Sequence, residues 1–409
     1  MENKTNTTCE YSELSPEQED FLKNYAWWVE MCGNLFVGVL GVVLNSITVI
    51  VLSTSTMRNN FFNRLLICLA IFDNLYLFCE LSEVFRLRYY TFLQQHMFAN
   101  FIYPVRSVFL CSSIYMTVSL TLERYHAITS PVQYRARGAT NMTSRLLRYV
   151  MPVLAFSTVY YLPKLLDINV DEITECMGNN VTAAVDDAQE VTRDNRYNNN
   201  CTIEYSLMPT DLRMDHHYVL WYMNISNLIL TAFIPLGVLM YLNCKIYLSL
   251  NQFMQRQPSA GTNTSRRQQL TDVKKTFILF SIVAIFVICH SLRIILNVDE
   301  FLNLTTFKEE QEKGCDGVKF WAQVILPLNQ LLIIINASAN FFIYVFFDKG
   351  FQQVLQQVFI IKSERQGHSK LNNGHEHTIN RGTLMNNATN QIELSVMNGN
   401  GTDHQTGDV

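Results

Sequence analysis

Long apolar runs constrain the fold of this chain more than any other feature of its sequence. The clearest cover 36–52, 277–289 and 326–347. A helix needs about 20 such residues to cross a hydrocarbon core of about 30 Å, and a backbone surrounded by lipid must pair all of its own N–H and C=O groups. Only 16% of the 409 residues are charged, where soluble domains carry about a quarter. The runs therefore predict helices that span a membrane.

We expect an all-α membrane protein in which seven such helices form one bundle over residues 31–347. The spans are placed at about 31–55, 61–86, 98–128, 146–166, 217–249, 272–298 and 319–347. Residues 1–30 precede the bundle, and residues 348–362 are expected to form a short amphipathic helix on the membrane surface. Residues 363–409 are polar and lack periodicity, which predicts a disordered tail.

The charges between the spans predict the orientation in the membrane. The segments 129–145 and 250–271 contain Arg and no Asp or Glu, whereas 24 of the 35 acidic residues lie in 1–30, 164–215 and 299–319. Because basic loops stay on the cytoplasmic side, we expect a plasma-membrane protein with an extracellular N-terminus and a cytoplasmic C-terminus. Five N-x-S/T triplets on the predicted outside are candidate glycosylation sites, at Asn3, Asn6, Asn180, Asn200 and Asn303.

Polar residues interrupt the spans at particular places. The first span holds Asn45 and the second Asp73, the third ends in Glu123-Arg124-Tyr125, and 336–344 in the seventh reads NASANFFIY. In this order on seven spans, over about residues 30–360, they resemble the rhodopsin-like G-protein-coupled receptors. The resemblance implies a signalling receptor rather than an enzyme, with heterotrimeric G proteins activated through outward movement of the sixth helix. Arrestin, a receptor kinase and membrane lipid are the further partners implied, with no cofactor and no nucleic acid.

Finer features are similar to the invertebrate FMRFamide-type neuropeptide receptors. The fourth span ends in YYLPK at 160–164, the fifth carries Pro235 and the sixth reads Cys289-His290. This resemblance implies an amidated neuropeptide as the extracellular ligand, and a basic peptide also suits the acidic outer side of the chain. A non-peptide ligand, such as an acid, a lipid or a hormone, stays open as the alternative.

The resemblance assigns an activation switch to the inner ends of the spans, at Glu123, Arg124, Tyr125, Asp272 and Tyr344. In the family's resting state, an acid at the place of Asp272 pairs with the arginine at the place of Arg124 and holds helices three and six together. A half-desolvated pair of this kind biases a two-state helix movement by about 1 kcal/mol. The alternative is that Asp272 only caps the sixth helix.

A second set matches the positions that form a sodium and water pocket in the family. It consists of Asp73, Ser113, Asn336 and Asn340. Carboxylate, hydroxyl and amide oxygens are suitable ligands for a hard cation. A hydrogen-bonded polar core that holds only water is the equal alternative.

The outer halves of the spans are expected to bind the ligand. Charged residues in spans two, three and six lie there, together with a histidine at the family's usual Trp position: Glu80, Glu83, Arg106, Arg293 and His290. Charges inside a membrane protein must be paired, so the two acids and two bases either pair with one another or bind opposite charges on a ligand. His290 is either a titratable switch or a core histidine.

The chain departs from the family pattern at several positions. Ala99 stands where the usual cysteine of the third span would be, so the usual disulfide to the long outer loop cannot form. Among the four cysteines on the predicted outside, we expect Cys176 to pair with Cys201, although sequence alone does not fix the connectivity. Leu292 and Phe341 replace the family's kink-forming prolines in spans six and seven.

Overall fold

The structure is a computed structural model of the chain, and it describes residues 14–86, 92–138, 141–176, 201–256, 263–303 and 319–358. The chain divides into two units, Met1–Leu355 and Gln356–Val409, of which the second is described only at its first residues. The predicted tail 363–409 lies outside the described residues.

Helices make up almost all of the described chain. In order they are α1 (Pro16–Ala26), η1 (Trp27–Gly33), α2 (Asn34–Leu52), α3 (Ser55–Arg58), α4 (Phe61–Arg86), α5 (Phe92–Met97), η2 (Phe98–Ile102), α6 (Tyr103–Thr129), α7 (Pro131–Gly138), α8 (Met142–Tyr161), η3 (Leu162–Leu166), α10 (Asp211–Met214), η5 (Tyr218–Ser226), η6 (Ile229–Phe233), α11 (Ile234–Arg256), α12 (Asn263–Leu302) and α14 (Phe320–Phe347). A further helix covers 349–358.

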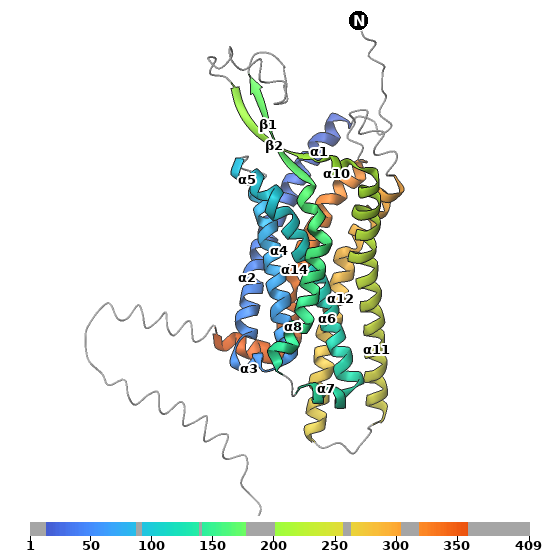
Figure 1. Cartoon of the computed structure of the whole chain (residues 1–409). Helices are drawn as coiled ribbons and strands as arrows, with labels where there is room; N and C mark the ends of the chain where they lie inside the picture. Colours follow the sequence, from blue (N-terminus) through green and yellow to red (C-terminus); the bar gives the residue numbers. More distant parts are fainter. Residues whose placement is uncertain are drawn as a thin grey trace, which may run out of the picture. The chain divides into compact units, whose positions relative to one another are not determined.

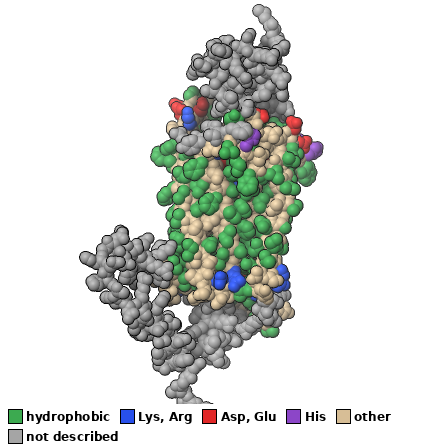
Figure 2. Space-filling view, turned by 60° about the vertical axis from the view of Figure 1, so that its left-hand side comes forward, with side chains coloured by type: hydrophobic (Ala, Val, Ile, Leu, Met, Phe, Trp, Pro, Cys, Tyr) green, Lys and Arg blue, Asp and Glu red, His purple; other side chains and the backbone are tan. Residues whose placement is uncertain are grey.

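Seven of the described helices are long and apolar enough to cross a membrane. They are Pro16–Leu52, Phe61–Arg86, Leu93–Thr129, Met142–Leu166, Tyr218–Gln252, Thr276–Leu302 and Phe320–Phe347. They lie side by side as a bundle in which α2 packs on α4 and α14, while α6 contacts α4, α8, α11 and α12 (Figure 1). Figure 2 shows a face of this bundle covered by hydrophobic side chains, as contact with lipid requires. The predicted all-α seven-span fold is confirmed.

The first span begins earlier than the apolar pattern predicts. Ser15 caps α1 with a capping box, since its hydroxyl accepts the N–H of Gln18 and the Gln18 side chain accepts the N–H of Ser15. The helix then continues without a break through η1 into α2. The polar sequence of α1 conceals this extension from a reading based on hydropathy.

The segment 164–215, expected only as a long loop, contains an antiparallel β-hairpin. Strand β1 (Ile168–Cys176) pairs with β2 (Cys201–Pro209), in a register that places Ile168 opposite Pro209 and Cys176 opposite Cys201. The hairpin lies at one end of the bundle, which we call the hairpin end (Figure 1). The opposite end carries α3 and α7, and we call it the α7 end.

The helix over 349–358 starts directly after α14. The carboxylate of Asp348 accepts the backbone N–H groups of Gly350 (2.9 Å) and Phe351 (3.2 Å) and so caps its first turn. Phe351 is fully buried, with ring centroids 5.7 Å from Tyr344 and 5.9 Å from Phe341. A short helix after the seventh span was predicted, and it is present.

The two helices that lack the family's kink-forming prolines are continuous. α12 runs for 40 residues with Leu292 in its interior, and α14 runs for 28 residues through Phe341. Neither helix has a proline at the positions that the family uses for kinks. Both helices therefore keep their backbone hydrogen bonds at positions where a proline would remove one.

A close approach of three helices depends on Gly41. A β-carbon at this position would lie 2.8 Å from Cβ of Ser338 on α14 and 2.9 Å from Cδ1 of Leu77 on α4. Such distances are too short for ordinary packing, so any side chain here forces the helices apart. Glycine thus sets the separation of α2 from its two neighbours.

Gly41→Ala is expected to destabilise the protein by about 1–3 kcal/mol, because the added methyl group overpacks this contact. The measurement is the melting temperature of the purified full chain in detergent. Gly237→Ala on α11 is the matched control, because a β-carbon there meets nothing within 4 Å and alanine favours the helix. Equal melting temperatures for the two variants would contradict the packing argument.

Candidate ligand and switch sites

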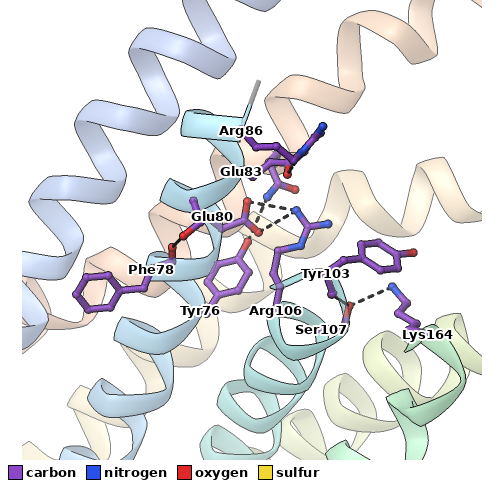
Figure 3. A network of polar contacts seen from close by, with 11 residues as sticks. Tyr76, Phe78, Glu80, Glu83, Arg86, Tyr103, Arg106, Ser107 and Lys164 are labelled. Carbon is purple, nitrogen blue, oxygen red and sulfur yellow. Dashed lines mark hydrogen bonds and ion pairs between the residues drawn. The ribbon is translucent and has the colours of Figure 1, made fainter. Parts of the chain in front are cut away.

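Glu80 and Arg106 form an ion pair between α4 and α6 toward the hairpin end. Nη1 of Arg106 lies 3.4 Å from Oε1 of Glu80, and the two side chains are 25% and 6% exposed. Figure 3 shows the guanidinium directed at the carboxylate across the gap between the helices. The pairing of these two residues was one of the alternatives open from the sequence. Because the contact is long and Arg106 keeps some exposure, the pair still has room for a further partner.

Glu83 has a different partner from those considered in the sequence. Arg86, three residues later on α4, binds its carboxylate at 2.6 and 2.9 Å. The same guanidinium donates to Gln95 and stacks 4.4 Å from the ring centroid of Phe98. The spacing of three residues on one helix is a signal that the sequence contained. Glu83 is thus less available to a ligand than Glu80.

Lys164 enters the bundle at the same level, although the sequence reading gave it no role. Its amine donates to Oγ of Ser107 (3.1 Å) and lies 4.7 Å from the ring centroid of Tyr103 (Figure 3). It also lies 5.4 Å from the ring centroid of Tyr161. Pro163 and Lys164 belong to the 3₁₀ turn η3, which follows α8 at the end of this span. A lysine is thereby surrounded by aromatic rings and a hydroxyl.

Arg293 and His290 are the two predicted ligand-binding residues on α12. Nη2 of Arg293 donates to Oδ1 of Asn227 (3.4 Å), and the hydroxyl of Tyr161 donates to the same oxygen (3.2 Å). His290 is buried against Phe286, with ring centroids 4.3 Å apart. The burial of His290 agrees with the core-histidine alternative.

Asp167 connects the hairpin to the bundle through hydrogen bonds. Its fully buried carboxylate accepts the hydroxyls of Tyr218 (2.6 Å) and Tyr103 (3.3 Å). Its backbone C=O accepts the N–H of Thr210 at the end of β2 (3.0 Å). This carboxylate therefore fixes the base of the hairpin to α6 and η5.

Three of the four predicted sodium ligands lie together in the middle of the bundle. Ser113 donates to Oδ1 of Asp73, and Nδ2 of Asn340 donates to Oδ2 at 2.8 Å. No hydrogen bond joins Asn336 to this group among the described side chains. Asn340 presents its amide nitrogen, which does not bind cations, so Asp73 and Ser113 would supply the oxygens for a sodium ion. The sodium site stays a prediction. The structure shows Asp73 hydrogen-bonded to Ser113 and Asn340 in a polar core.

Glu123 is the centre of a polar network at the α7 end. Its side chain is 0% exposed and binds Nη2 of Arg145 on α8 at 2.8 Å. The hydroxyls of Tyr134 on α7 and Tyr149 on α8 donate to the carboxylate at 2.7 and 2.8 Å. Burial and then the charge of Glu123 raise the pKa of Tyr134, which keeps this hydroxyl a donor. The guanidinium of Arg145 also stacks over Phe61, 4.2 Å from its centroid.

The other described switch residues make contacts of their own. The guanidinium of Arg124 lies 4.0 Å from the ring centroid of Phe62, and Tyr125 packs at the edge of the core. Tyr344 is buried and contacts Phe351. The side chain of Asp272 lies outside the described ones, so its predicted pairing with Arg124 stays a prediction.

The predicted disulfide and glycosylation sites fall largely outside the described side chains. The register of the hairpin sets Cys176 directly opposite Cys201, and opposed residues of antiparallel strands have Cα atoms about 4.5–5.5 Å apart, within the range of disulfides. Asn303 is described, and its amide nitrogen donates to the Asp299 carboxylate (2.8 Å). Asn3, Asn6, Asn180 and Asn200 are not among the described residues.

Comparison with known proteins agrees with the fold and with the polar positions. A family model described as a seven-transmembrane receptor of the rhodopsin family matches residues 44–344. An FMRFamide receptor of Drosophila melanogaster is 27% identical over 345 residues, which cover 81% of this chain and 54%, or about half, of that protein. An FMRFamide peptide receptor of Caenorhabditis elegans is 24% identical over 346 residues, which cover 81% of this chain and 69% of that protein. The chain belongs to the rhodopsin family of seven-transmembrane receptors, and it is a receptor rather than an enzyme.

Proposed function

We propose that the chain is a plasma-membrane receptor for an amidated peptide of the FMRFamide type, and that it activates heterotrimeric G proteins through movement of α12. The observation that carries the ligand class is the similarity to two FMRFamide receptors along 81% of the chain. The charged group at Glu80, Arg106, Lys164 and Arg293 supports a polar ligand at the hairpin end.

The proposed orientation places the hairpin end outside the cell. Figure 2 shows Asp and Glu side chains gathered at the hairpin end of one face, and Lys and Arg side chains near the α7 end. Basic residues remain cytoplasmic, and an acidic outer surface attracts a peptide that contains arginine. The α7 end then contacts the G protein, and arrestin and a receptor kinase are proposed as further partners there.

A screen of synthetic amidated peptides on cells that express the full chain tests the ligand class. FMRFamide and related peptides are expected to raise calcium or to change cyclic AMP in these cells and not in untransfected ones. Free-acid versions of the same peptides control for the C-terminal amide. Responses only to non-peptide acids or lipids, at normal surface expression, would favour the alternative ligand class, which the cationic side chains at the hairpin end also suit.

Asp272→Ala is expected to raise ligand-free signalling by about fivefold, because loss of a half-desolvated pair with Arg124 removes about 1 kcal/mol from the resting state. The measurement is basal second-messenger level at matched surface expression. Asp299→Ala is the control, since this acid lies at the other end of α12 and pairs with Lys319 at 3.4 Å. Unchanged basal signalling in Asp272→Ala would contradict the pairing with Arg124 and favour the alternative that Asp272 only caps α12.

A further inference from the structure

Two cationic side chains in the hairpin half of the bundle, Lys164 and Arg293, have no ion pair among the described residues. Arg106 has Glu80 as its partner. Among the described residues, neither Lys164 nor Arg293 has a carboxylate within 4.0 Å. The oxygens of Asp167 accept two tyrosine hydroxyls, and this carboxylate lies more than 4.0 Å from the amine of Lys164. Lys164 and Arg293 therefore have no ion-pair partner among the described side chains.

The two cations that lack an ion pair both lie near Tyr161. The amine of Lys164 lies 5.4 Å from the centroid of its ring. Its hydroxyl donates to Oδ1 of Asn227, the oxygen that also accepts Arg293. Lys164 on η3 and Arg293 on α12 are thus linked through Tyr161, one at its ring and the other through the oxygen that accepts its hydroxyl.

The neutral contacts of these two cations do not balance their charge. An aromatic ring stabilises a cation by about 0.5–2 kcal/mol, and the hydroxyl of Ser107 and the amide of Asn227 supply only neutral oxygens. Charged side chains in membrane helices are costly unless an opposite charge accompanies them, and two like charges close together add to the cost. A guanidinium fork beside an ammonium group is well suited to a carboxylate.

We propose that Lys164 and Arg293 bind an acidic group on the peptide ligand. This inference rests on the proposed function, because the acid belongs to the ligand that enters the hairpin half. The cationic arginine of the peptide is then free to approach Glu80, so the ligand carries both signs of charge. Lys164 and Arg293 therefore gain an acidic partner only when the ligand is bound.

The test compares FMRFamide carrying an N-terminal succinyl group, which is acidic, with FMRFamide carrying a neutral acetyl group, each attached directly and through two glycines. On the unmodified receptor, one or both succinyl peptides are expected to be at least tenfold more potent than the acetyl peptide of the same length. In Lys164→Gln and Arg293→Gln the difference is expected to fall below threefold. Lys319→Gln, which removes another cation at the hairpin end, is the control and is expected to keep the preference. Equal potency of both pairs on the unmodified receptor, or a preference that persists in both variants, overturns the proposal.

A second measurement does not depend on FMRFamide as the agonist. The melting temperature of the purified full chain is expected to rise with succinate and not with equimolar succinamide, and this rise is expected to disappear in Lys164→Gln. If all peptides are inactive but succinate stabilises the receptor, the peptide assignment fails and the anion site stands. If succinate gives no rise and no succinyl peptide is preferred, the anion site fails, whether or not FMRFamide activates the receptor.

Discussion

Arg145→Ala is expected to destabilise the protein by about 3–5 kcal/mol, because it leaves the buried charge of Glu123 without its ionic partner. The carboxylate is 0% exposed and keeps only the hydroxyls of Tyr134 and Tyr149. The stacking of the guanidinium over Phe61 is lost as well. We expect a large fall in surface expression and a lower melting temperature of the purified protein.

Two further variants separate charge from packing. Arg148→Ala, one turn later on the same helix, removes an exposed arginine and is expected to change stability by less than about 0.5 kcal/mol. Combining Arg145→Ala with Glu123→Gln removes the unpaired charge and is expected to recover at least half of the lost stability. Equal melting temperatures for Arg145→Ala and Arg148→Ala would show that the buried pair contributes nothing.

Arg106→Gln is expected to raise the agonist concentration for half-maximal response by about 10–100-fold, which corresponds to about 1.4–2.8 kcal/mol of lost interaction. The guanidinium lies 3.4 Å from Glu80 and remains partly exposed toward the hairpin half. Surface expression is expected to stay near normal. Glu83→Gln, for which the sequence also predicts reduced potency, is expected to have the smaller effect because Arg86 already binds Glu83.

A double variant separates a structural role of the Glu80–Arg106 pair from ligand binding. If the two residues only neutralise each other, combining Arg106→Gln with Glu80→Gln restores agonist potency. Direct binding of the ligand predicts that the double variant is no better than Arg106→Gln alone. Calcium or cyclic AMP responses at matched surface expression provide the comparison.

The sequence predicted those features that depend on the chain's local pattern. The predicted second and seventh spans agree with their observed limits within a residue. The seventh is a nearly continuous apolar run, whereas Arg64, Asp73, Glu80 and Glu83 interrupt the second. The start of the first span at Pro16 was missed because α1 is polar, although the Ser15–Gln18 capping box was readable. The β-hairpin is not predicted because the whole segment 164–215 is treated as one polar loop, although 201–207 (CTIEYSL) alternates apolar and polar residues as a strand does.

The side chains that contact Glu123 and Lys164 are harder to predict, because they come from different helices. Arg145 was read only as a basic loop residue that indicates orientation, yet the structure buries it against Glu123. The sequence shows Lys164 only as part of the YYLPK motif, and its place beside Ser107 depends on the turn at η3. Arg86 is the exception, since its position three residues after Glu83 on one helix was available from spacing alone.

The continuous α12 has a mechanical consequence. A helix of 40 residues is about 60 Å long, and without a proline it lacks the usual point at which a helix bends. Such a rod responds to a push at one end by tilting as a lever about the place where it is packed most tightly. A small displacement of Arg293 by a bound ligand would then reach the far end of α12 in proportion to the lengths of the two arms, with no flexible joint to absorb it.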